Sequence, residues 1–362
     1  MSKNRKVLLM GKSDHINFGD ILMAGYWAAW VAELGLEPML VNPTDEFYEH
    51  VRLMVPGVKR TLLQAVRPND VLAGIYFGGG YFGQTITSPL GWIGKWGNES
   101  PFWRFHLYLS KNKIPYAGFS VEIGPIFNFA AKKKITSIIS SASLFVARNN
   151  KSASYASKLT NKSIPEGGDV IFEVESSCID KNTGNLGVDK LAVHVTDKVS
   201  NRSARTRSFL NAIVAVDGIR AMSEVILIFD APASDDQLEA VKWLTERIQS
   251  PTRISHFKNC RETINSVSAC SHLITTKLHL GVTALAKRKN VLCFSDHPKV
   301  ARFYKQNKFE SNLETFNFSS GTQKKRQISK FISTKKIVRR PNVENFYEVE
   351  TKRWLMSLEG AI

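Results

Sequence analysis

Short apolar runs alternate with amphipathic patterns of helical period along most of the chain. In the first half, runs rich in Val, Ile, Leu and Phe predict strands over residues 6–10, 38–41, 71–77, 115–120, 144–147 and 169–172. Helical patterns between them cover residues 20–34, 102–112 and 153–159. Strands that alternate with helices are typical of α/β proteins, so we expect an α/β fold.

The second half repeats this alternation. Strands are expected over residues 191–196, 225–230, 253–256, 272–275 and 291–294. The pattern over residues 234–249 predicts an amphipathic helix, in which Ser234 can cap the first turn and Asp235 and Asp236 suit the positive end. Further helices are expected over residues 279–287 and 341–358, and the latter could pack back on another element.

Residues 175–189 are the best candidate for a linker, because they are rich in Ser, Asn and Gly. We therefore predict an N-terminal α/β lobe over residues 1–178, a C-terminal α/β lobe over residues 190–340 and a C-terminal helix over residues 341–362 that packs back. A length of 362 residues agrees with two domains. Two such lobes would enclose a cleft, and open α/β sheets bind ligands beyond the carboxyl ends of their strands.

The chain is strongly basic. Lys and Arg number 49 against 32 Asp and Glu, a net charge of +17, which favours an anionic substrate, a polyanionic partner or an acidic membrane surface. Residues 321–340 hold eight basic residues and no acidic one. This segment is either a solvated surface or a contact with an anionic lipid surface or glycan.

Several classes of protein are disfavoured. No apolar run approaches the roughly 20 residues of a membrane-spanning helix, and the apolar run at residues 7–10 is too short for a signal peptide, so we expect a cytoplasmic protein. The four cysteines form no C-x-x-C pair, so we expect reduced, partly buried thiols instead of a zinc or redox site. Basic runs at residues 132–134 and 287–289 come without a zinc-finger or RNP-type motif, so nucleic-acid binding is not expected.

Two glycine-containing motifs follow predicted strands of the first half. At residues 17–20 (Asn-Phe-Gly-Asp), the glycine suits a tight loop, and Asp20 either caps the next helix or accepts a hydrogen bond from a sugar hydroxyl. The three glycines at residues 78–80 either form a simple turn or leave backbone N–H groups open to an anion. The pattern is not G-x-G-x-x-G, so dinucleotide binding is only weakly indicated.

Charged side chains follow three other predicted strands. Arg148 closes the strand at residues 144–147, where its planar fork could hold a carboxylate or phosphate or lie on the surface. After the strand at residues 272–275, Lys277 could neutralise an anion while His279 transfers a proton near neutral pH, although histidine is also a structural residue. His297 and Lys299 add charge after the strand at residues 291–294 or lie on a loop surface.

These motifs, in this order, resemble the polysaccharide pyruvyl transferase family. The family pattern runs from N-x-G-D through a G-G-G loop, a G-P loop, a strand-end arginine before a serine-containing helix, a G-D pair and an R-x-H segment to a closing D-x-x-K-V. The corresponding positions are residues 17–20, 78–80, 124–125, Arg148 with Ser152, and residues 168–169, 277–279 and 296–300. Lys277 stands where the family has arginine, which keeps the charge but loses bidentate geometry, and Asn149 stands where an acidic residue is common.

The resemblance implies two Rossmann-like lobes of the GT-B kind, with phosphoenolpyruvate as donor and a sugar of a polysaccharide or its lipid-linked precursor as acceptor. The product would be a pyruvate ketal bridging two sugar hydroxyls. His279 is then the expected acid/base, and Asp20 orients or deprotonates the attacking hydroxyl. The expected substrate-binding residues are Arg148, Lys277, Asn17, Gly78, Gly79, Gly80 and Lys299. No metal or cofactor is expected, and peripheral contact with the inner face of the plasma membrane would bring the lipid-linked acceptor within reach.

A GT-B-type glycosyltransferase that uses a nucleotide-sugar is the alternative, because the same fold and basic residues would serve it. Against it, the second half contains no pair of glutamates with seven residues between them, a spacing that many such enzymes use.

Overall fold

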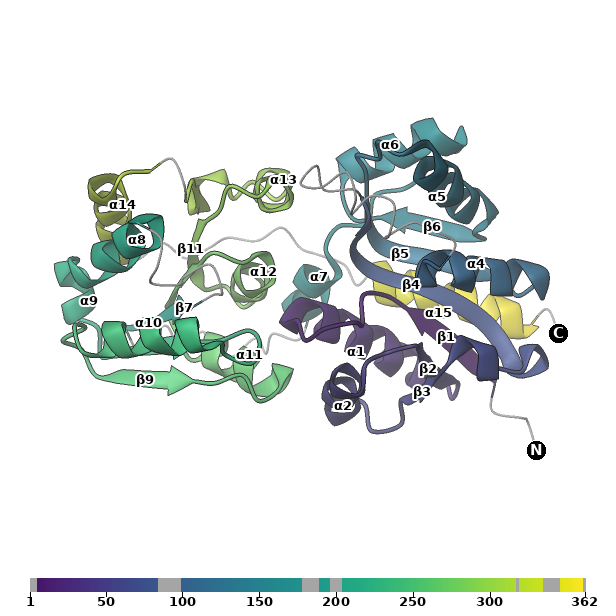
Figure 1. Cartoon of the computed structure of the whole chain (residues 1–362), viewed down its shortest axis with the longest axis horizontal. Coiled ribbons are helices and arrows are strands. Elements are labelled where there is room, and N and C mark those ends of the chain that lie inside the picture. The colour runs from purple at the N-terminus through teal and green to yellow at the C-terminus, as the bar shows by residue number, and fades with distance from the viewer. Residues whose placement is uncertain are drawn as a thin grey trace. The chain divides into compact units, whose positions relative to one another are not determined.

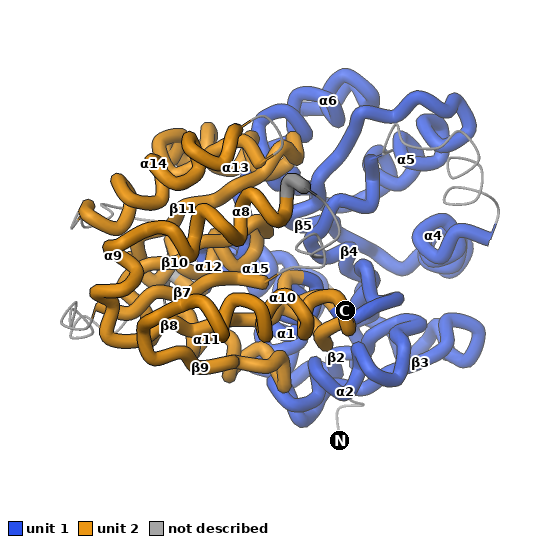
Figure 2. The backbone as a smooth tube through the Cα atoms, turned by 60° about the vertical axis from the view of Figure 1, so that its left-hand side comes forward, with its two compact units in different colours: residues 1–16, 20–174, 344–362 blue, residues 17–19, 175–343 orange. Residues whose placement is uncertain are grey.

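The chain divides into two compact units, which Figure 2 shows in blue and orange. Unit 1 comprises residues 1–16, 20–174 and 344–362, and unit 2 comprises residues 17–19 and 175–343. The computed structural model describes residues 5–83, 99–177, 189–195, 204–316, 319–334 and 346–360. Most of the predicted linker, residues 178–188, lies outside the described residues.

The described part of unit 1 contains a parallel six-stranded sheet with the order β3-β2-β1-β4-β5-β6 (Figure 1). This is the strand order of a doubly wound Rossmann sheet. The strands are β1 (Lys6–Met10), β2 (Glu37–Val41), β3 (Lys59–Thr61), β4 (Val71–Phe82), β5 (Tyr116–Ile123) and β6 (Leu144–Ala147). The helices are α1 (Phe18–Glu33), α2 (Asp45–Met54), α4 (Pro101–Lys111), α5 (Phe129–Ser141), α6 (Asn150–Thr160), α7 (Val170–Ser177), which begins in this unit, and α15 (Phe346–Gly360).

Aromatic side chains pack helices on both faces of this sheet. On one face, Tyr76 of β4 meets Phe105 of α4 with ring centroids 5.1 Å apart. On the other, the fully buried Trp27 of α1 stacks on Phe77 and Phe119 at 6.4 and 6.2 Å. Consecutive residues Tyr76 and Phe77 thus serve opposite faces, as the two-residue period of a strand requires.

The last helix, α15, completes the face of unit 1 that carries Trp27. Tyr347 contacts the Trp27 ring at 5.9 Å, and Trp354 contacts Phe119 at 6.2 Å. Lys352 Nζ lies 2.5 Å from Glu33 at the end of α1. The helix predicted near the C-terminus is therefore present, and it contributes buried side chains to unit 1.

The described part of unit 2 contains a second parallel six-stranded sheet, with the order β12-β11-β10-β7-β8-β9. When these strands are numbered within the unit and the sheet is read from β9, this is the same Rossmann order. The strands are β7 (Lys190–His194), β8 (Glu224–Ile228), β9 (Thr252–Ser255), β10 (His272–Thr275), β11 (Asn290–Phe294) and β12 (Leu313–Glu314). The helices are α8 (Ala204–Val214), α9 (Asp217–Arg220), α10 (Asp235–Thr245), α11 (Cys260–Ser268), α12 (Leu278–Ala286), α13 (Pro298–Gln306) and α14 (Gly321–Ser333).

The predicted start of α10 is confirmed. Ser234 Oγ accepts a hydrogen bond from Gln237 N at 3.4 Å, and Ser234 N donates to Gln237 Oε1 at 2.8 Å. This reciprocal capping box satisfies N–H groups that a helix start leaves without partners.

The strand predicted over residues 169–172 is wrong, because these residues begin α7. Gly168 adopts φ +97°, and Asp169 Oδ1 accepts a hydrogen bond from Ile171 N at 3.0 Å, which supports the first turn. The β-branched Val170 and Ile171 favour a strand by propensity, but their complete burial lets tertiary packing override that weak preference.

The basic segment at residues 321–340 is only partly exposed in the described residues. Within α14, Lys325, Arg326 and Lys330 are exposed, as expected. Lys324 is buried instead: its Nζ donates to Ser319 O at 2.6 Å. Residues 335–340 lie outside the described residues.

Cys260, Cys270 and Cys293 are buried free thiols, as expected, and Cys178 lies outside the described residues. Burial raises the pKa of Cys293 to about 12, so this thiol stays protonated. Among the described residues, no helix combines the length and apolarity that crossing a membrane requires.

Candidate active site

In unit 2, Lys277 and His279 lie where β10 ends and α12 begins. β10 is buried along its whole length and ends at Thr275. Lys277 is the N-cap residue of α12, with extended φ and ψ of −111° and 147°, and the half-buried His279 follows in the first turn. Leu278 and Leu280 on either side of His279 are buried, which anchors this turn in the core.

Lys277 belongs to a ring of four polar residues at the ends of three neighbouring strands, β8, β7 and β10. Lys277 Nζ lies 3.4 Å from Asp230 Oδ2, and Asp230 Oδ1 lies 3.1 Å from His194 Nε2. His194 Nδ1 lies 3.1 Å from Thr275 Oγ1, which accepts a hydrogen bond from Lys277 N at 3.1 Å. Burial opposes the charged form of Asp230, but the nearby His194 and Lys277 outweigh it and hold the pKa of this carboxyl well below its usual range.

Residues 17–19, which begin α1, are grouped with unit 2. Asn17 Oδ1 accepts a hydrogen bond from Gly19 N at 3.0 Å, and Phe18 N donates to Asp230 O at 3.3 Å. Gly19 lies directly against His279, because a Cβ at this position would be 1.8 Å from His279 Nδ1. Glycine is therefore required for space, and the structure brings the predicted residues Asn17, Lys277 and His279 into one region.

In unit 1, the predicted glycine loop is part of β4 instead of following it. Gly78 and Gly79 have φ of +28° and +105°, and the pairing with β5 shifts register between Gly79 and Phe82. A Cβ on Gly78 would lie 2.2 Å from Met23 Sδ, so α1 packs directly on this backbone. The glycines thus form an irregular, bulged strand, and Gly80 is its exposed residue.

Asp20 lies beside this bulge. It is in the first turn of α1, which begins at Phe18, so the interpretation of Asp20 as the helix cap is wrong. Its side chain is nearly buried, and Oδ1 lies 3.8 Å from the position of a Cβ on Gly79. Burial and the Asp20 carboxylate together raise the pKa of Tyr81, which keeps that hydroxyl neutral.

Arg148 forms an ion pair with Asp169, and both side chains are buried, 6% and 2% exposed. Burial opposes the charge of Arg148, but the carboxylates of Asp169 and Glu122 raise its pKa above the ordinary value. Beside Asp169, the carbonyl of Gly168 accepts hydrogen bonds from Tyr347 Oη at 2.8 Å and Ser120 Oγ at 3.2 Å. The guanidinium is therefore held inside unit 1, with one nitrogen on Asp169.

Lys299 lies at the start of α13, after β11, the neighbour of β10 in the sheet. It is half-buried, and its N–H donates to His297 Nδ1 at 3.3 Å. Among the described residues, no cluster of three or more His, Cys, Asp or Glu could hold a metal ion.

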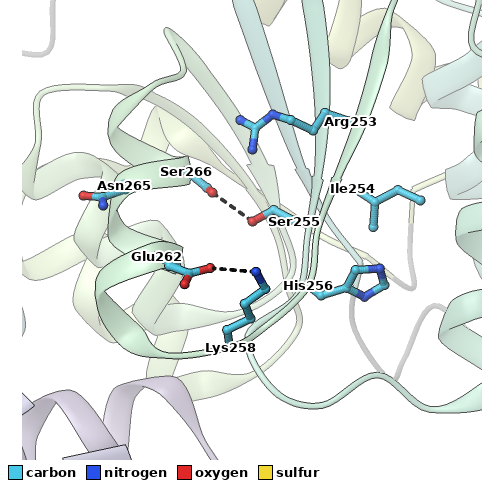
Figure 3. A pocket seen from close by; sticks show the side chains of 8 residues that line it. All are labelled: Arg253, Ile254, Ser255, His256, Lys258, Glu262, Asn265 and Ser266. Atoms are coloured by element: carbon cyan, nitrogen blue, oxygen red, sulfur yellow. Dashed lines mark hydrogen bonds and ion pairs between the residues drawn. The ribbon is translucent and has the colours of Figure 1, made fainter. Parts of the chain in front are cut away.

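A separate hollow of about 400 Å³ lies between β9 and α11 (Figure 3). Its cations already have carboxylate partners: Lys258 Nζ lies 3.8 Å from Glu262, and Arg253 donates to Glu224 at 3.0 Å. None of the site residues predicted from the sequence lines this hollow.

Sequence reasoning missed His194, Asp230 and Glu122 as site residues. Asp230 carried a signal, because it is the polar residue that ends an apolar strand run. His194 lies inside the run predicted as a strand over residues 191–196, and Glu122 follows the strand predicted over residues 115–120. Only the sheet order shows that His194 faces Asp230 and Thr275.

The family model for polysaccharide pyruvyl transferases matches residues 17–298, well over half of the chain. The chain belongs to the polysaccharide pyruvyl transferase family. The resemblance drawn from the ordered motifs is confirmed, and membership implies an enzyme of polysaccharide biosynthesis. A search of curated proteins finds no significant match.

Solved structures share the fold of this pyruvyl transferase family member. A putative UDP-N-acetylglucosamine 2-epimerase from Listeria monocytogenes aligns with a TM-score of 0.67 at 10% identity, covering 98% of this chain and 96% of that one. The UDP-GlcNAc 2-epimerase from Methanocaldococcus jannaschii gives 0.62 at 10% identity, over 98% and 99%. Acinetobacter baumannii MurG gives 0.50 at 10% identity, over 98% and 99%. At such identity the likeness is one of fold alone, and it confirms the predicted GT-B-like architecture of two α/β lobes.

Proposed function

We propose that this enzyme transfers pyruvate from phosphoenolpyruvate to a sugar of a polysaccharide or a lipid-linked precursor and forms a pyruvate ketal. The observation that carries this proposal is the family match over residues 17–298, which includes Lys277 and His279 at the carboxyl end of β10.

The proposed reaction balances without an added oxidant or reductant. A proton adds to the methylene carbon of phosphoenolpyruvate, and a sugar hydroxyl attacks the carbon that bears the phosphate. The bond from that carbon to the phosphate oxygen breaks and releases inorganic phosphate. A second sugar hydroxyl then closes the ketal. Of the two protons lost by the sugar, one ends on the new methyl group and the other leaves with phosphate.

His279 is proposed as the acid/base of these proton transfers. It is half-buried at the carboxyl end of β10, and imidazole exchanges protons near neutral pH. A positioned group of this kind typically contributes about 10²- to 10⁴-fold. Asp20, nearly buried beside the β4 bulge, is proposed to orient or deprotonate the attacking hydroxyl.

Phosphoenolpyruvate carries a carboxylate and a phosphate, so its binding requires positive charge and backbone donors. We assign the charge to Lys277 and Lys299, and polar contacts to Asn17 and the glycines Gly78, Gly79 and Gly80. Arg148 would act by its charge more than by bidentate hydrogen bonds to the donor, because its side chain is 6% exposed and paired with Asp169.

The function is tested by incubating the enzyme with phosphoenolpyruvate and a panel of simple and lipid-linked glycosides, followed by mass measurement of each acceptor. A gain of one pyruvate less one water supports the proposal. A gain of a hexose, with a nucleotide-sugar supplied, would instead assign the enzyme to the glycosyltransferase alternative. Thermal stabilisation by phosphoenolpyruvate, but not by UDP or GDP, is expected from the same protein.

The role of His279 is tested separately. His279→Ala should abolish acceptor-dependent phosphate release, whereas His50→Ala, a histidine on α2, should keep it. Near-normal turnover by His279→Ala would remove His279 from the mechanism.

We also propose a cytoplasmic enzyme that meets its acceptor at an anionic membrane surface through α14. The exposed cations Lys325, Arg326 and Lys330 support this contact. Reversing these three charges should weaken binding to vesicles that contain anionic lipid, and unchanged binding would exclude the contact.

A further inference from the structure

His194 and Asp230 form a buried polar pair behind the partly exposed Lys277. The side chains of His194 and Asp230 are 0% and 8% exposed, against 32% for Lys277. An Asp and a His so deeply buried cost free energy unless their polar atoms are paired, so their burial at this place calls for a reason. Their contacts lead to one side chain that can reach a ligand, Lys277.

Lys277 is held at both ends by the same ring. Its backbone N–H donates to Thr275 Oγ1 at 3.1 Å, and its ammonium lies 3.4 Å from Asp230 Oδ2. His194 joins these two anchors, since Nδ1 lies 3.1 Å from Thr275 Oγ1 and Nε2 lies 3.1 Å from Asp230 Oδ1. The carboxylate thus uses one oxygen for His194 and the other for Lys277, which fixes its orientation.

We propose that the His194–Asp230 pair, together with Thr275, is a positioning unit that fixes the Lys277 ammonium as the cation for an anionic substrate. The proposal rests on the function proposed above, because it takes phosphoenolpyruvate as that substrate. A lysine side chain is a point charge on a flexible stem, and it lacks the rigid planar fork with which arginine holds an anion. A buried carboxylate of fixed orientation restricts where that charge can lie, which lowers the entropic cost of binding.

Substrate kinetics give the first test. Asp230→Asn and Thr275→Val should each raise the KM for phosphoenolpyruvate by about tenfold, roughly the loss of one charge-assisted contact, with a smaller change in kcat. Thr275→Ser keeps the hydroxyl and should behave as the unaltered enzyme. Thr283→Val is the matched control, since Thr283 is a buried threonine of α12 whose hydroxyl has no hydrogen-bond partner among the described residues.

A double variant separates positioning from a general structural role. If Asp230 acts through Lys277, then Asp230→Asn combined with Lys277→Ala should raise KM no more than Lys277→Ala alone. Additive increases in KM would show that Asp230 acts independently of Lys277 and would overturn the proposal.

Chemical labelling tests the positioning without relying on turnover. The rate at which an amine-selective acylating reagent modifies Lys277, followed by peptide mass spectrometry, should rise several-fold in Asp230→Asn, because loss of the carboxylate frees the ammonium from its ion pair. Lys287, which pairs with Glu175 at 2.7 Å, should keep its rate in both proteins. An unchanged rate at Lys277 would refute positioning by Asp230, whatever the substrate. A raised rate in a protein that never consumes phosphoenolpyruvate would support the positioning unit and reject the proposed function instead.

Discussion

The buried pair of Arg148 and Asp169 makes a prediction that depends on a third residue, Glu122. Both members of the pair are buried, so removing one strands the other away from water. Breaking a buried pair in this way typically costs about 3–5 kcal/mol of unfolding free energy. The two single substitutions should not cost the same, because Glu122 also acts on Arg148.

Asp169→Asn leaves Arg148 with the carboxylate of Glu122, so the loss should be near 3 kcal/mol, the low end of that range. Arg148→Met leaves two buried carboxylates without their cation, and the loss should approach 5 kcal/mol. The double variant should be less destabilised than Arg148→Met alone, because it removes one of those carboxylates. Arg148→Met should also regain stability as the pH falls: stranded carboxyls have raised pKa values in the folded state, so protonation favours folding.

Urea unfolding monitored by tryptophan fluorescence measures these differences. The exposed pair Arg353 and Glu350 on α15 is the control, and breaking it should change the free energy of unfolding by less than about 1 kcal/mol. The reasoning is refuted if Asp169→Asn costs more than Arg148→Met, or if the two single losses simply add in the double variant.

Three further predictions concern single residues. Gly19→Ala should displace the His279 imidazole, because the new Cβ would lie 1.8 Å from Nδ1, and should lower turnover about 100-fold. The control is Gly57→Ala, where the new Cβ meets nothing within 4 Å and turnover should be unchanged. Phosphate release measures the turnover of both variants. Burial raises the pKa of Glu173 to about 8, so its proton favours the folded state and stability should fall as the pH rises from about 4.5 to 8. In urea unfolding between pH 5 and 9, Glu173→Gln should flatten the dependence of the unfolding free energy on pH. An unchanged dependence would contradict the raised pKa of Glu173. Ser234→Ala removes the cap of α10 and should cost about 1 kcal/mol in the same assay, so a loss below about 0.3 kcal/mol would argue against the capping box.

Local patterns were sufficient to predict the fold class because buried parallel strands read as apolar runs bounded by polar loops. The run at residues 225–230 and the capped helix after it are clear examples. The same rule fails at residues 169–172, where β-branched residues are buried in a helix. The rule also predicts an end of β4 that is too early, because glycines normally interrupt strands. In the structure, β4 continues through the bulge at Gly78 and Gly79.

A residue of the candidate site could be predicted where it follows the end of a strand. It could not be predicted where its place depends on a partner that is distant in the sequence. Lys277 and His279 follow β10 directly, so their common location is visible in the sequence. The pairing of Arg148 with Asp169 links residues 21 apart, and the contact of His194 with Thr275 links residues 81 apart. The second contact is set by the order of strands in the sheet and the first by the tertiary placement of the start of α7, and no local pattern contains either.

The excess of positive charge and the proposed binding cations are separate properties of this chain. Lys277 lies against Asp230 and Arg148 against Asp169, so each of these cations comes with a buried carboxylate that cancels most of its field at long range. The exposed face of α14 instead presents Lys325, Arg326 and Lys330, and α14 contains no acidic residue. Charge that attracts a large anionic surface must be exposed and unbalanced, whereas charge that binds one small anion must be fixed in place. The net charge of +17 therefore supports the proposed contact with an anionic surface, whereas the proposed donor depends on a few oriented groups that contribute little to that total.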